Sequence, residues 1–412
     1  MDPRDALARK AVLAFLSRLR GGCLEVAEGG RTHVCGDPAA GLRATVHIEN
    51  PRAWRQMLRG SLGAGEAFVD GDWRADDLVA ALRIVARNLH GLDRLRRLAY
   101  PVTGPMQRAL ARVPANTLRG ARENISAHYD LGNDLFAAFL DERMIYSCAF
   151  FEDPDASLEQ AQLAKLERIC RALALTPDDH LVEIGTGWGG LAIHAAAEYG
   201  CRVTTTTISR RQAEYARAKV EEAGLADRVE VVERDYRELT GRYDKLVSIE
   251  MIEAVGWQYF REFFRRCSEL LHDDGLMFLQ AIVIADELYE HEKAARSFAN
   301  THIFPGGCLP SRRLIRELTA EQHLRVLSWE DITAHYPPTL AAWRERFNEA
   351  APRLRERGYD ERFARLWNFY LASSEAGFRE HRIGDVQALF AKPGYAGTTS
   401  AEARAGTAVR AA

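Results

Sequence analysis

Residues 181–190 constrain the fold of this 412-residue chain more than any other segment. They begin as a short apolar strand, LVEI, pass through the glycine-rich turn GTGWGG, and lead into the apolar helical stretch 191–197. Glycine accepts positive φ and lets a ligand approach the backbone, and free N–H groups at a helix start bind polar ligands. We interpret the segment as the first strand–turn–helix unit of a doubly wound sheet, where nucleotide-like cofactors bind. The alternative is a glycine-rich turn that binds nothing.

Strands and helices alternate after this segment. The predicted strands are 181–184, 202–208, 229–233, 243–249, 276–284, 324–329 and 386–392, with a turn at 272–275. Helices are predicted at 157–173, 209–223, 259–271 and 311–322. This rhythm predicts an α/β fold, a Rossmann-like parallel sheet with helices on both faces.

The N-terminal part has a different pattern, that of a smaller α+β domain. Helices are predicted at 6–20, 51–59 and 78–89, strands at 23–26, 32–34 and 44–48, and a loop at the glycine-rich residues 60–73. We therefore divide the chain into an N-terminal accessory domain associated with lipid or substrate (1–91), a basic linker (92–122), a catalytic domain (123–393) and a disordered tail (394–412).

Two segments lie outside the regular pattern. Residues 92–122 are rich in arginine and interrupted by proline, which fits a solvated linker or a surface that contacts anionic lipid headgroups. Residues 285–310 form a long insert, and inserts of this length often cover active sites.

Composition excludes several classes of function. The chain is 47% hydrophobic and 27% charged with a net charge of -3, so no overall basic field points to nucleic acid. No apolar run reaches the length of a membrane span, and the N-terminus lacks the apolar core of a signal peptide. The seven cysteines have no metal-ligand spacing. We expect a cytoplasmic protein with reduced thiols and no metal site.

Polar residues follow the predicted strands at their carboxyl ends, the edge at which ligands bind in such sheets. They are Gly185, Thr186 and Gly187 after the first, Thr207, Ser209 and Gln212 after the second, residues 235–237 after the third, and Glu250 and Glu253 after the fourth. The first three groups are suited to the amino-acid, ribose and adenine parts of a nucleoside. Thr207 and Ile208 stand where nicotinamide enzymes usually have an acid, which disfavours that cofactor.

The pattern E-x-G-x-G-x-G at residues 183–189 resembles the first motif of S-adenosylmethionine (SAM) methyltransferases. The chain as a whole resembles the cyclopropane-fatty-acid synthase family, which includes the mycolic acid cyclopropane synthases. The resemblance rests on residues 128–133 (HYDLGN), 146–148 (YSC), 183–190 (EIGTGWGG), 209–212 (SRRQ), 235–237 (DYR), 251–256 (MIEAVG), 304–311 (FPGGCLPS), 335–336 (HY) and 339–340 (TL). Residues 60–66 (GSLGAGE), continuing to Trp73, resemble the family's N-terminal domain.

The resemblance implies methyl transfer from SAM to a cis double bond of an acyl chain in a phospholipid. The alkene attacks the sulfonium methyl, a carbocation forms, and loss of a proton from the new methyl closes a cyclopropane ring. Alignment must supply much of the rate, because an alkene is a poor nucleophile. The cation requires electron-rich walls and the exclusion of water. Aromatic side chains near Tyr146 and Tyr336 suit that need, although Phe136 and Phe150 are simpler as core.

Site residues follow from the resemblance position by position. The cofactor-binding residues are Tyr146, Ser147, Gly185, Gly187, Thr207, Gln212, Tyr236 and Arg237. The catalytic residues, which in the family hold a bicarbonate ion that acts as the base, are Cys148, Glu253, Gln280, the Ile282 backbone and Tyr336. Gln280 stands where the family has histidine, and a glutamine cannot carry the imidazole's proton. We assign Cys148 to ion or substrate contact and not to nucleophilic attack.

Alternatives to the cyclopropane product stay open. Proton loss after a hydride shift gives a methylene branch, and related family members make methylene or methyl branches. Further from the family, the chain could methylate a soluble small molecule, or bind SAM or lipid without catalysis. The expected partners are an unsaturated phospholipid and a membrane surface, contacted transiently, with no nucleic acid. The resemblance also allows a homodimer.

Overall fold

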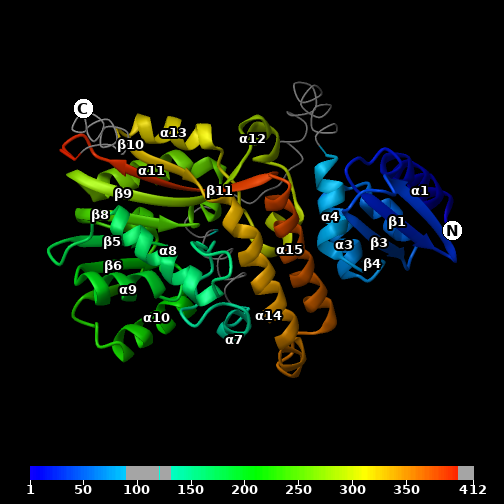
Figure 1. Cartoon of the computed structure of the whole chain (residues 1–412). Coiled ribbons are helices and arrows are strands. Elements are labelled where there is room, and N and C mark those ends of the chain that lie inside the picture. The colour runs from blue at the N-terminus through cyan, green and yellow to red at the C-terminus, as the bar shows by residue number, and fades with distance from the viewer. Residues whose placement is uncertain (90–119, 121–130, 398–412) are drawn as a thin grey trace. The chain divides into compact units, whose positions relative to one another are not determined.

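The computed structural model describes residues 1–89, 120 and 131–397 (Figure 1). By contacts the chain forms two compact units. The first unit comprises the described residues of Met1–Val113, Glu290–Pro305 and Tyr336–Ile383, and the second those of Pro114–Tyr289, Gly306–His335 and Gly384–Ala412. Both the 290–305 segment and residues 336–383, which the sequence analysis placed in the catalytic domain, pack with the N-terminal residues. The predicted linker (92–122) and most of the predicted tail lie outside the described residues.

A seven-stranded sheet forms the centre of the second unit, in the order β10-β11-β9-β8-β5-β6-β7. Its strands are β5 His180–Ile184, β6 Arg202–Thr207, β7 Val229–Glu233, β8 Tyr243–Ile249, β9 Leu271–Ile284, β10 Arg325–Asp331 and β11 Ile383–Ala391. Strands β7, β6, β5, β8 and β9 pair in parallel, and β10 pairs with β11 antiparallel. The chain order reverses between β5 and β8, which creates the switch point where such sheets bind ligands.

Both faces of this sheet are buried. Neighbouring residues of one strand point into opposite cores, as Val182 and Leu181 do on β5. One core packs α11 (Phe260–Leu270) and α13 (Arg312–Glu321) against the sheet, and the other packs α8 (Leu158–Ala172), α9 (Gly190–Tyr199) and α10 (Arg210–Glu222). The predicted doubly wound α/β fold is confirmed. The turn predicted at 272–275 instead falls within the long strand β9.

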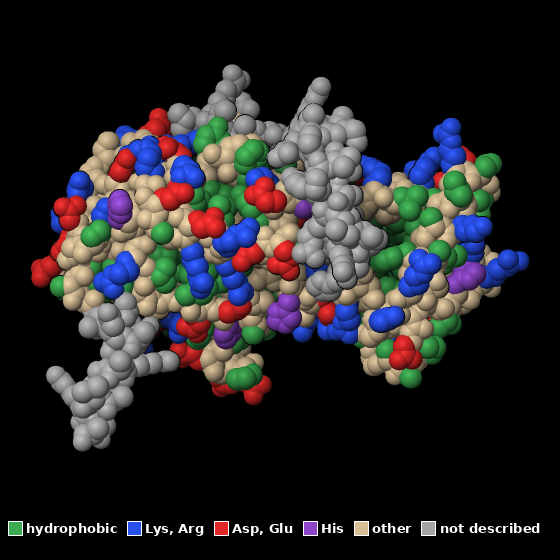
Figure 2. Space-filling model, turned by 90° about the horizontal axis from the view of Figure 1, so that it is seen from above, with side chains coloured by type: hydrophobic (Ala, Val, Ile, Leu, Met, Phe, Trp, Pro, Cys, Tyr) green, Lys and Arg blue, Asp and Glu red, His purple; other side chains and the backbone are tan. Residues whose placement is uncertain are grey.

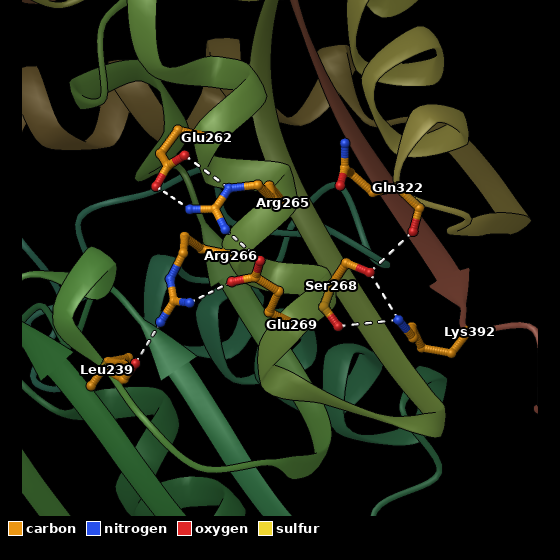
Figure 3. A network of polar contacts seen from close by, with 8 residues as sticks. All are labelled: Leu239, Glu262, Arg265, Arg266, Ser268, Glu269, Gln322 and Lys392. Atoms are coloured by element: carbon orange, nitrogen blue, oxygen red, sulfur yellow. Dashed lines mark hydrogen bonds and ion pairs between the residues drawn. The ribbon is translucent and has the colours of Figure 1, made fainter.

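Polar contacts fix α11 to the elements around it (Figure 3). Arg265 pairs with Glu262 and Glu269 on its own helix, and Arg266 reaches the Leu239 carbonyl oxygen at 2.5 Å. The Lys392 ammonium, just beyond β11, donates to the Ser268 hydroxyl at 2.9 Å. These contacts join the outer end of the helix to two connections of the sheet.

Acidic and basic side chains are interspersed on the face of the second unit that Figure 2 shows. Elsewhere in the unit, exposed ion pairs form within one helix, such as Arg210 with Glu214 and Lys219 with Glu222 on α10. Exposed pairs of this kind contribute about 0–1 kcal/mol each. They balance the surface charge without adding much stability.

The first unit contains a four-stranded sheet in the order β2-β1-β3-β4. The strands are β1 Cys23–Glu28, β2 Arg31–Gly36, β3 Arg43–Ile48 and β4 Trp73–Ala75. The helices of the unit are α1 Pro3–Leu16, α2 Arg52–Met57, α3 Gly60–Val69, α4 Leu78–Arg87, α14 Tyr336–Glu356 and α15 Glu361–Arg379. Of the remaining helices, α7 (Asn133–Ala137) belongs to the second unit, and α12 (Asp286–Glu292) and a π-helix (Ala299–Ile303) occupy the 285–310 insert. The insert's expected role as a cover stays a prediction.

The loop predicted at residues 60–73 is wrong, because α3 occupies most of it. Close packing requires glycine at two positions of this helix. A Cβ on Gly65 would lie 2.3 Å from Phe298 and 2.6 Å from Phe369, and one on Gly63 would lie 2.0 Å from the Gln56 carbonyl oxygen. The tertiary contacts therefore stabilise a helix that the local sequence disfavours.

We expect Gly65→Ala to destabilise the first unit by about 1–3 kcal/mol, because the added methyl overlaps two aromatic rings. Helix propensity alone predicts the opposite sign, a gain of up to about 1 kcal/mol. Denaturant unfolding measures the difference, with Ser61→Ala on the exposed side of α3 as the matched control. A stabilised Gly65→Ala protein would contradict the packing.

No helix among the described residues is both long and apolar enough to cross a bilayer.

Candidate functional site

A pocket opens at the carboxyl ends of β5, β6 and β8 in the second unit. All eight residues predicted to bind the cofactor line it: Tyr146, Ser147, Gly185, Gly187, Thr207, Gln212, Tyr236 and Arg237. They come from the segment that precedes α8 and from the carboxyl ends of β5, β6 and β7. The structure therefore brings the whole predicted set together at the switch point.

The glycine-rich turn forms the floor of this pocket. The N–H groups of Gly185 and Thr186 donate to the Thr206 carbonyl oxygen at 3.0 and 3.1 Å, which fixes the turn to β6. Gly187 has φ +52°, and a Cβ built on it would meet no atom within 4 Å. The backbone is thus bare where α9 begins, so a ligand can approach it closely.

Thr207 and Gln212 are fixed to each other at the end of β6. The Thr207 hydroxyl donates to the Gln212 side-chain oxygen at 2.9 Å, and the Ser209 hydroxyl caps α10 by accepting from the Gln212 N–H at 3.3 Å. This leaves an ordered polar wall without the acidic residue that nicotinamide enzymes use.

Tyr236 and Arg237 have different surroundings. The Tyr236 ring packs edge-on against Phe263 with centroids 5.5 Å apart, and burial raises the pKa of its hydroxyl. Arg237 pairs with Asp235, its Nε and terminal nitrogen each 2.8 Å from a carboxylate oxygen. A bidentate pair of this kind holds the guanidinium in one orientation over the Tyr259 ring.

Lys165 on α8 is buried behind Ser147 and also lines the pocket. Its ammonium donates to the Ser147 hydroxyl at 2.6 Å, and the Gln162 amide donates to the Ser147 carbonyl oxygen at 2.9 Å. Burial lowers the pKa of Lys165, and the nearby carboxylates, Glu250 first among them, oppose that shift. The wall of the cofactor pocket therefore contains a buried titratable side chain, fixed by its hydrogen bond to Ser147.

Gln280 on β9 is the hub of a second buried group. Its amide nitrogen donates to Glu250 Oε1 at 2.7 Å, to Asp385 Oδ2 at 3.2 Å and to the Cys148 carbonyl oxygen at 3.4 Å. Its oxygen accepts from the Gln387 amide at 3.0 Å. Two predicted catalytic residues, Cys148 and Gln280, are thus in direct contact, but the amide of Gln280 is engaged by protein groups.

Glu253 lies beside this group. Its Oε1 accepts from the Ile282 N–H at 2.5 Å, which joins two more of the predicted catalytic residues. Among the described residues, nothing hydrogen-bonds to its buried Oε2. Burial, with a smaller contribution from Glu250, raises the pKa of Glu253 to about 8. A carboxyl group that titrates near neutral pH is suited to proton transfer.

Tyr336, the fifth predicted catalytic residue, lies in the first unit. Its ring stacks on Phe378 with centroids 3.9 Å apart. Its predicted contact with the ion stays a prediction.

Three members of the site were not predicted: Lys165, Asp385 and, as a site residue, Glu250. The sequence carried a signal for Lys165, because Gln162 and Lys165 fall on the buried face of α8 between Leu158 and Leu166. A polar side chain at a core position requires a polar partner. The carboxylate of Asp385, on β11, could be related to Glu250 only by the three-dimensional fold.

Comparisons with known proteins agree with this geometry. A family model described as mycolic acid cyclopropane synthetase matches residues 116–388. The chain is 38% identical over 343 residues to the tuberculostearic acid methyltransferase UfaA1 of Mycobacterium tuberculosis, covering 81% of this chain and 79% of that protein. It is 37% identical over 352 residues to the cyclopropane-fatty-acyl-phospholipid synthase of Escherichia coli, covering 85% and 88%.

Solved structures give the same result. The cyclopropane synthase MmaA2 from Mycobacterium tuberculosis superposes with a TM-score of 0.62 at 30% identity, covering 66% of this chain and 98% of that one. The mycolic acid cyclopropane synthase CmaA1, complexed with SAH and CTAB, gives 0.62 at 29% identity with the same coverage. The chain belongs to the mycolic acid cyclopropane synthetase family, a family of SAM-dependent lipid methyltransferases.

Proposed function

We propose that this protein transfers a methyl group from SAM to a cis double bond of an acyl chain within a phospholipid and closes a cyclopropane ring. The observation that carries the proposal is the pocket at the switch point, in which all eight predicted cofactor residues meet. The synthase of Escherichia coli, named for a fatty-acyl-phospholipid product, is 37% identical over most of both chains.

The residues of the pocket suit this chemistry. The reaction has a poor nucleophile and a cationic intermediate, so it depends on alignment and on electron-rich walls. Tyr146 and Trp188 line the pocket, and each lies edge-on or tilted to Phe136, with ring centroids 5.3 and 4.8 Å away. The Trp188 indole N–H donates to Asn133 at 2.9 Å. Rings fixed in this way present π-faces to a developing cation.

A methylene- or methyl-branched product is the second candidate. Gln280 favours it, because the family has histidine there and the cyclopropane chemistry of the family uses that position. UfaA1, a tuberculostearic acid methyltransferase by name, is as similar to this chain as the Escherichia coli synthase is. Both products require the same first step, and they differ in the carbon that loses the proton.

The residues of the site do not fit the bicarbonate ion expected from the resemblance. The Gln280 amide contacts two carboxyl groups, and the Ile282 N–H is bonded to Glu253. The Cys148 thiol donates to the Ala149 carbonyl oxygen at 3.3 Å. An added anion would also meet the acidic side chain of Glu250, a group of like charge. No step through bicarbonate is therefore part of the proposal.

Lipid analysis after incubation with SAM and cis-unsaturated phospholipid vesicles tests the function. We expect a mass gain of one methylene unit, one SAH per modified chain, and high-field cyclopropyl protons in the NMR spectrum. Terminal-alkene protons at the same mass would establish the branching reaction. SAH formation with a soluble acceptor but not with lipid would favour a small-molecule methyltransferase, and SAM binding without any SAH a non-catalytic role.

We further propose that the protein works at a membrane surface, with the arginines between Arg94 and Arg122 contacting anionic headgroups. Replacing them by glutamine is expected to weaken co-sedimentation with anionic vesicles at low salt, by up to about 1 kcal/mol for each arginine near the surface. Neutral vesicles are the control. Unchanged binding across a salt series would exclude this contact. The cytoplasmic location and the homodimer stay predictions.

A further inference from the structure

Glu250 and Asp385 form a buried carboxyl pair at the edge of the cofactor pocket. Asp385 is fully buried, its side chain hydrogen-bonds to that of Glu250, and both accept from the Gln280 amide, at 3.2 and 2.7 Å. The Cys148 N–H also donates to Glu250 Oε1 at 3.0 Å. Burial, and next the charge of Glu250, raise the pKa of Asp385 well above its usual value. A hydrogen bond between two carboxyl groups requires one proton, and burial favours its place on Asp385.

Glu250 is also the member of the pair that is exposed to the pocket. It lines the pocket together with Tyr146 and Gly185, at the carboxyl end of the central strand β8. Its backbone has φ +48°, a conformation that non-glycine residues rarely adopt. Backbone strain of this kind is typical of functional sites, where the surrounding structure enforces it.

The charge of Glu250 acts on three neighbouring titratable groups. It favours the ammonium of Lys165, which lines the same pocket, and it raises the pKa values of the acids Glu253 and Asp385. Burial and this charge raise the pKa of Glu253 to about 8 and that of Asp385 well above its usual value. Two acids with raised pKa values thus adjoin Glu250, and enzymes separate bases from acids by pushing apart the pKa values of neighbouring groups.

We propose that Glu250 is the protein's own general base, the group that takes the proton from the carbocation, and that Gln280 and Asp385 hold it ionised and oriented. This inference rests on the proposed function. The alkene forms a bond to the SAM methyl, and the sulfur leaves with its bonding electrons as SAH. A C–H bond of the cation then supplies its electrons to the ring or to the new double bond, and its proton passes to the Glu250 carboxylate. The proton reaches solvent when SAH and lipid leave.

Gln280 acquires a specific role in this scheme. A histidine at this position could donate to both carboxyl groups only as the positively charged imidazolium, through one ring nitrogen to each. The neutral amide of Gln280 donates to Glu250 and Asp385 together while its oxygen is held by Gln387. The proton that a carbocation loses is highly acidic, so a weak base is sufficient. That base has to be ionised and correctly placed.

The first test needs no variant. Wild-type turnover, measured as SAH release and modified lipid in decarbonated buffer under argon, is expected to be unchanged when bicarbonate is added. A fall in turnover on decarbonation that bicarbonate reverses would overturn the inference while leaving the proposed function intact. Absence of SAH release with lipid under every condition would instead refute the proposed function.

The second test replaces the base. Glu250→Gln is expected to lower kcat at least about 100-fold with the Kd for SAM within threefold, and Glu250→Asp to retain more activity than Glu250→Gln. Glu230→Gln, an exposed carboxylate on β7 outside the pocket, is the matched control and should keep wild-type kcat. SAM binding by each variant shows that the site is folded.

Chemical rescue separates a base from a structural residue. Glu250→Ala leaves space for a small carboxylate, so added formate is expected to restore part of the kcat of this variant. Formate is not expected to raise the kcat of Glu250→Gln, whose side chain fills that space. A Glu250→Gln protein that binds SAM and turns over at the wild-type rate would overturn the inference. Equal rescue of both variants would do so as well.

Discussion

Glu253→Gln is expected to make the protein more stable near pH 8 and to abolish methyl transfer. The pKa of Glu253 is raised from 4.5 to about 8, mainly by burial. Below pH 4.5 the carboxyl group is protonated in both the folded and the unfolded chain, so it has no effect on stability. Between pH 4.5 and 8 only the unfolded chain ionises, which lowers the stability of the wild type as pH rises. Each pKa unit is worth about 1.4 kcal/mol, so the loss reaches several kcal/mol.

A glutamine at this position avoids that loss, and its oxygen can still accept from the Ile282 N–H. Turnover is lost because the family resemblance places Glu253 among the catalytic residues, and an amide cannot replace a carboxyl group there. The Kd for SAM should change less than threefold, since Glu253 does not line the cofactor pocket. Denaturant unfolding at pH 5 and pH 8 gives the stability difference. Equal stabilities at pH 8, or near wild-type turnover, would contradict the assignment.

Lys165→Met is expected to destabilise the second unit by about 3–5 kcal/mol, the cost of leaving a buried charge without its partner. The ammonium is fully buried among carboxyl groups, and methionine has a similar shape but no charge. Loss of the hydrogen bond to Ser147 should also weaken SAM binding, because both residues line the pocket. Unfolding midpoints in denaturant and SAM titration measure the two effects.

Lys219→Met on the exposed face of α10 is the matched control, and its ion pair with Glu222 is worth less than about 1 kcal/mol. Combining Lys165→Met with Glu250→Gln is expected to recover part of the lost stability, because the second change removes the carboxylate left alone. Fully additive effects of the two substitutions would show that Lys165 and Glu250 do not interact.

Local sequence was sufficient for the elements of the second unit. Its strands are short and apolar and are separated by helices with one buried stripe, so periodicity alone located β5, β6, β7 and β8 to within a residue or two. Six of the eight predicted cofactor residues end or follow one of these strands, and the other two, Tyr146 and Ser147, belong to a family motif. Sheet topology then brings them to one edge.

The errors and omissions have a common physical cause. Helix α3 was missed because the reason for its glycines lies in tertiary packing. A Cβ on Gly65 would overlap Phe298 and Phe369, which are more than 200 positions away in the sequence. The carboxyl pair was missed because Glu250 follows β8 and Asp385 lies on β11, and only the folded sheet brings these two strands together. In both cases the residues next to the position in the sequence do not explain the residue found there. The explanation is a contact with a partner that is distant along the chain.

The composition of the first unit from distant segments has a consequence for the nascent chain. Helices α3 and α4 are synthesised early, but Glu380, which pairs with Arg83, follows 297 positions later. At ribosomal rates of about 5–20 residues per second, that partner emerges roughly 15–60 s afterwards. Until then Phe68 and Trp73 lack Phe369, the ring that packs against both in the finished protein. The core of the first unit therefore stays incomplete during translation. Its apolar surface is exposed to chaperones until the C-terminal helices emerge.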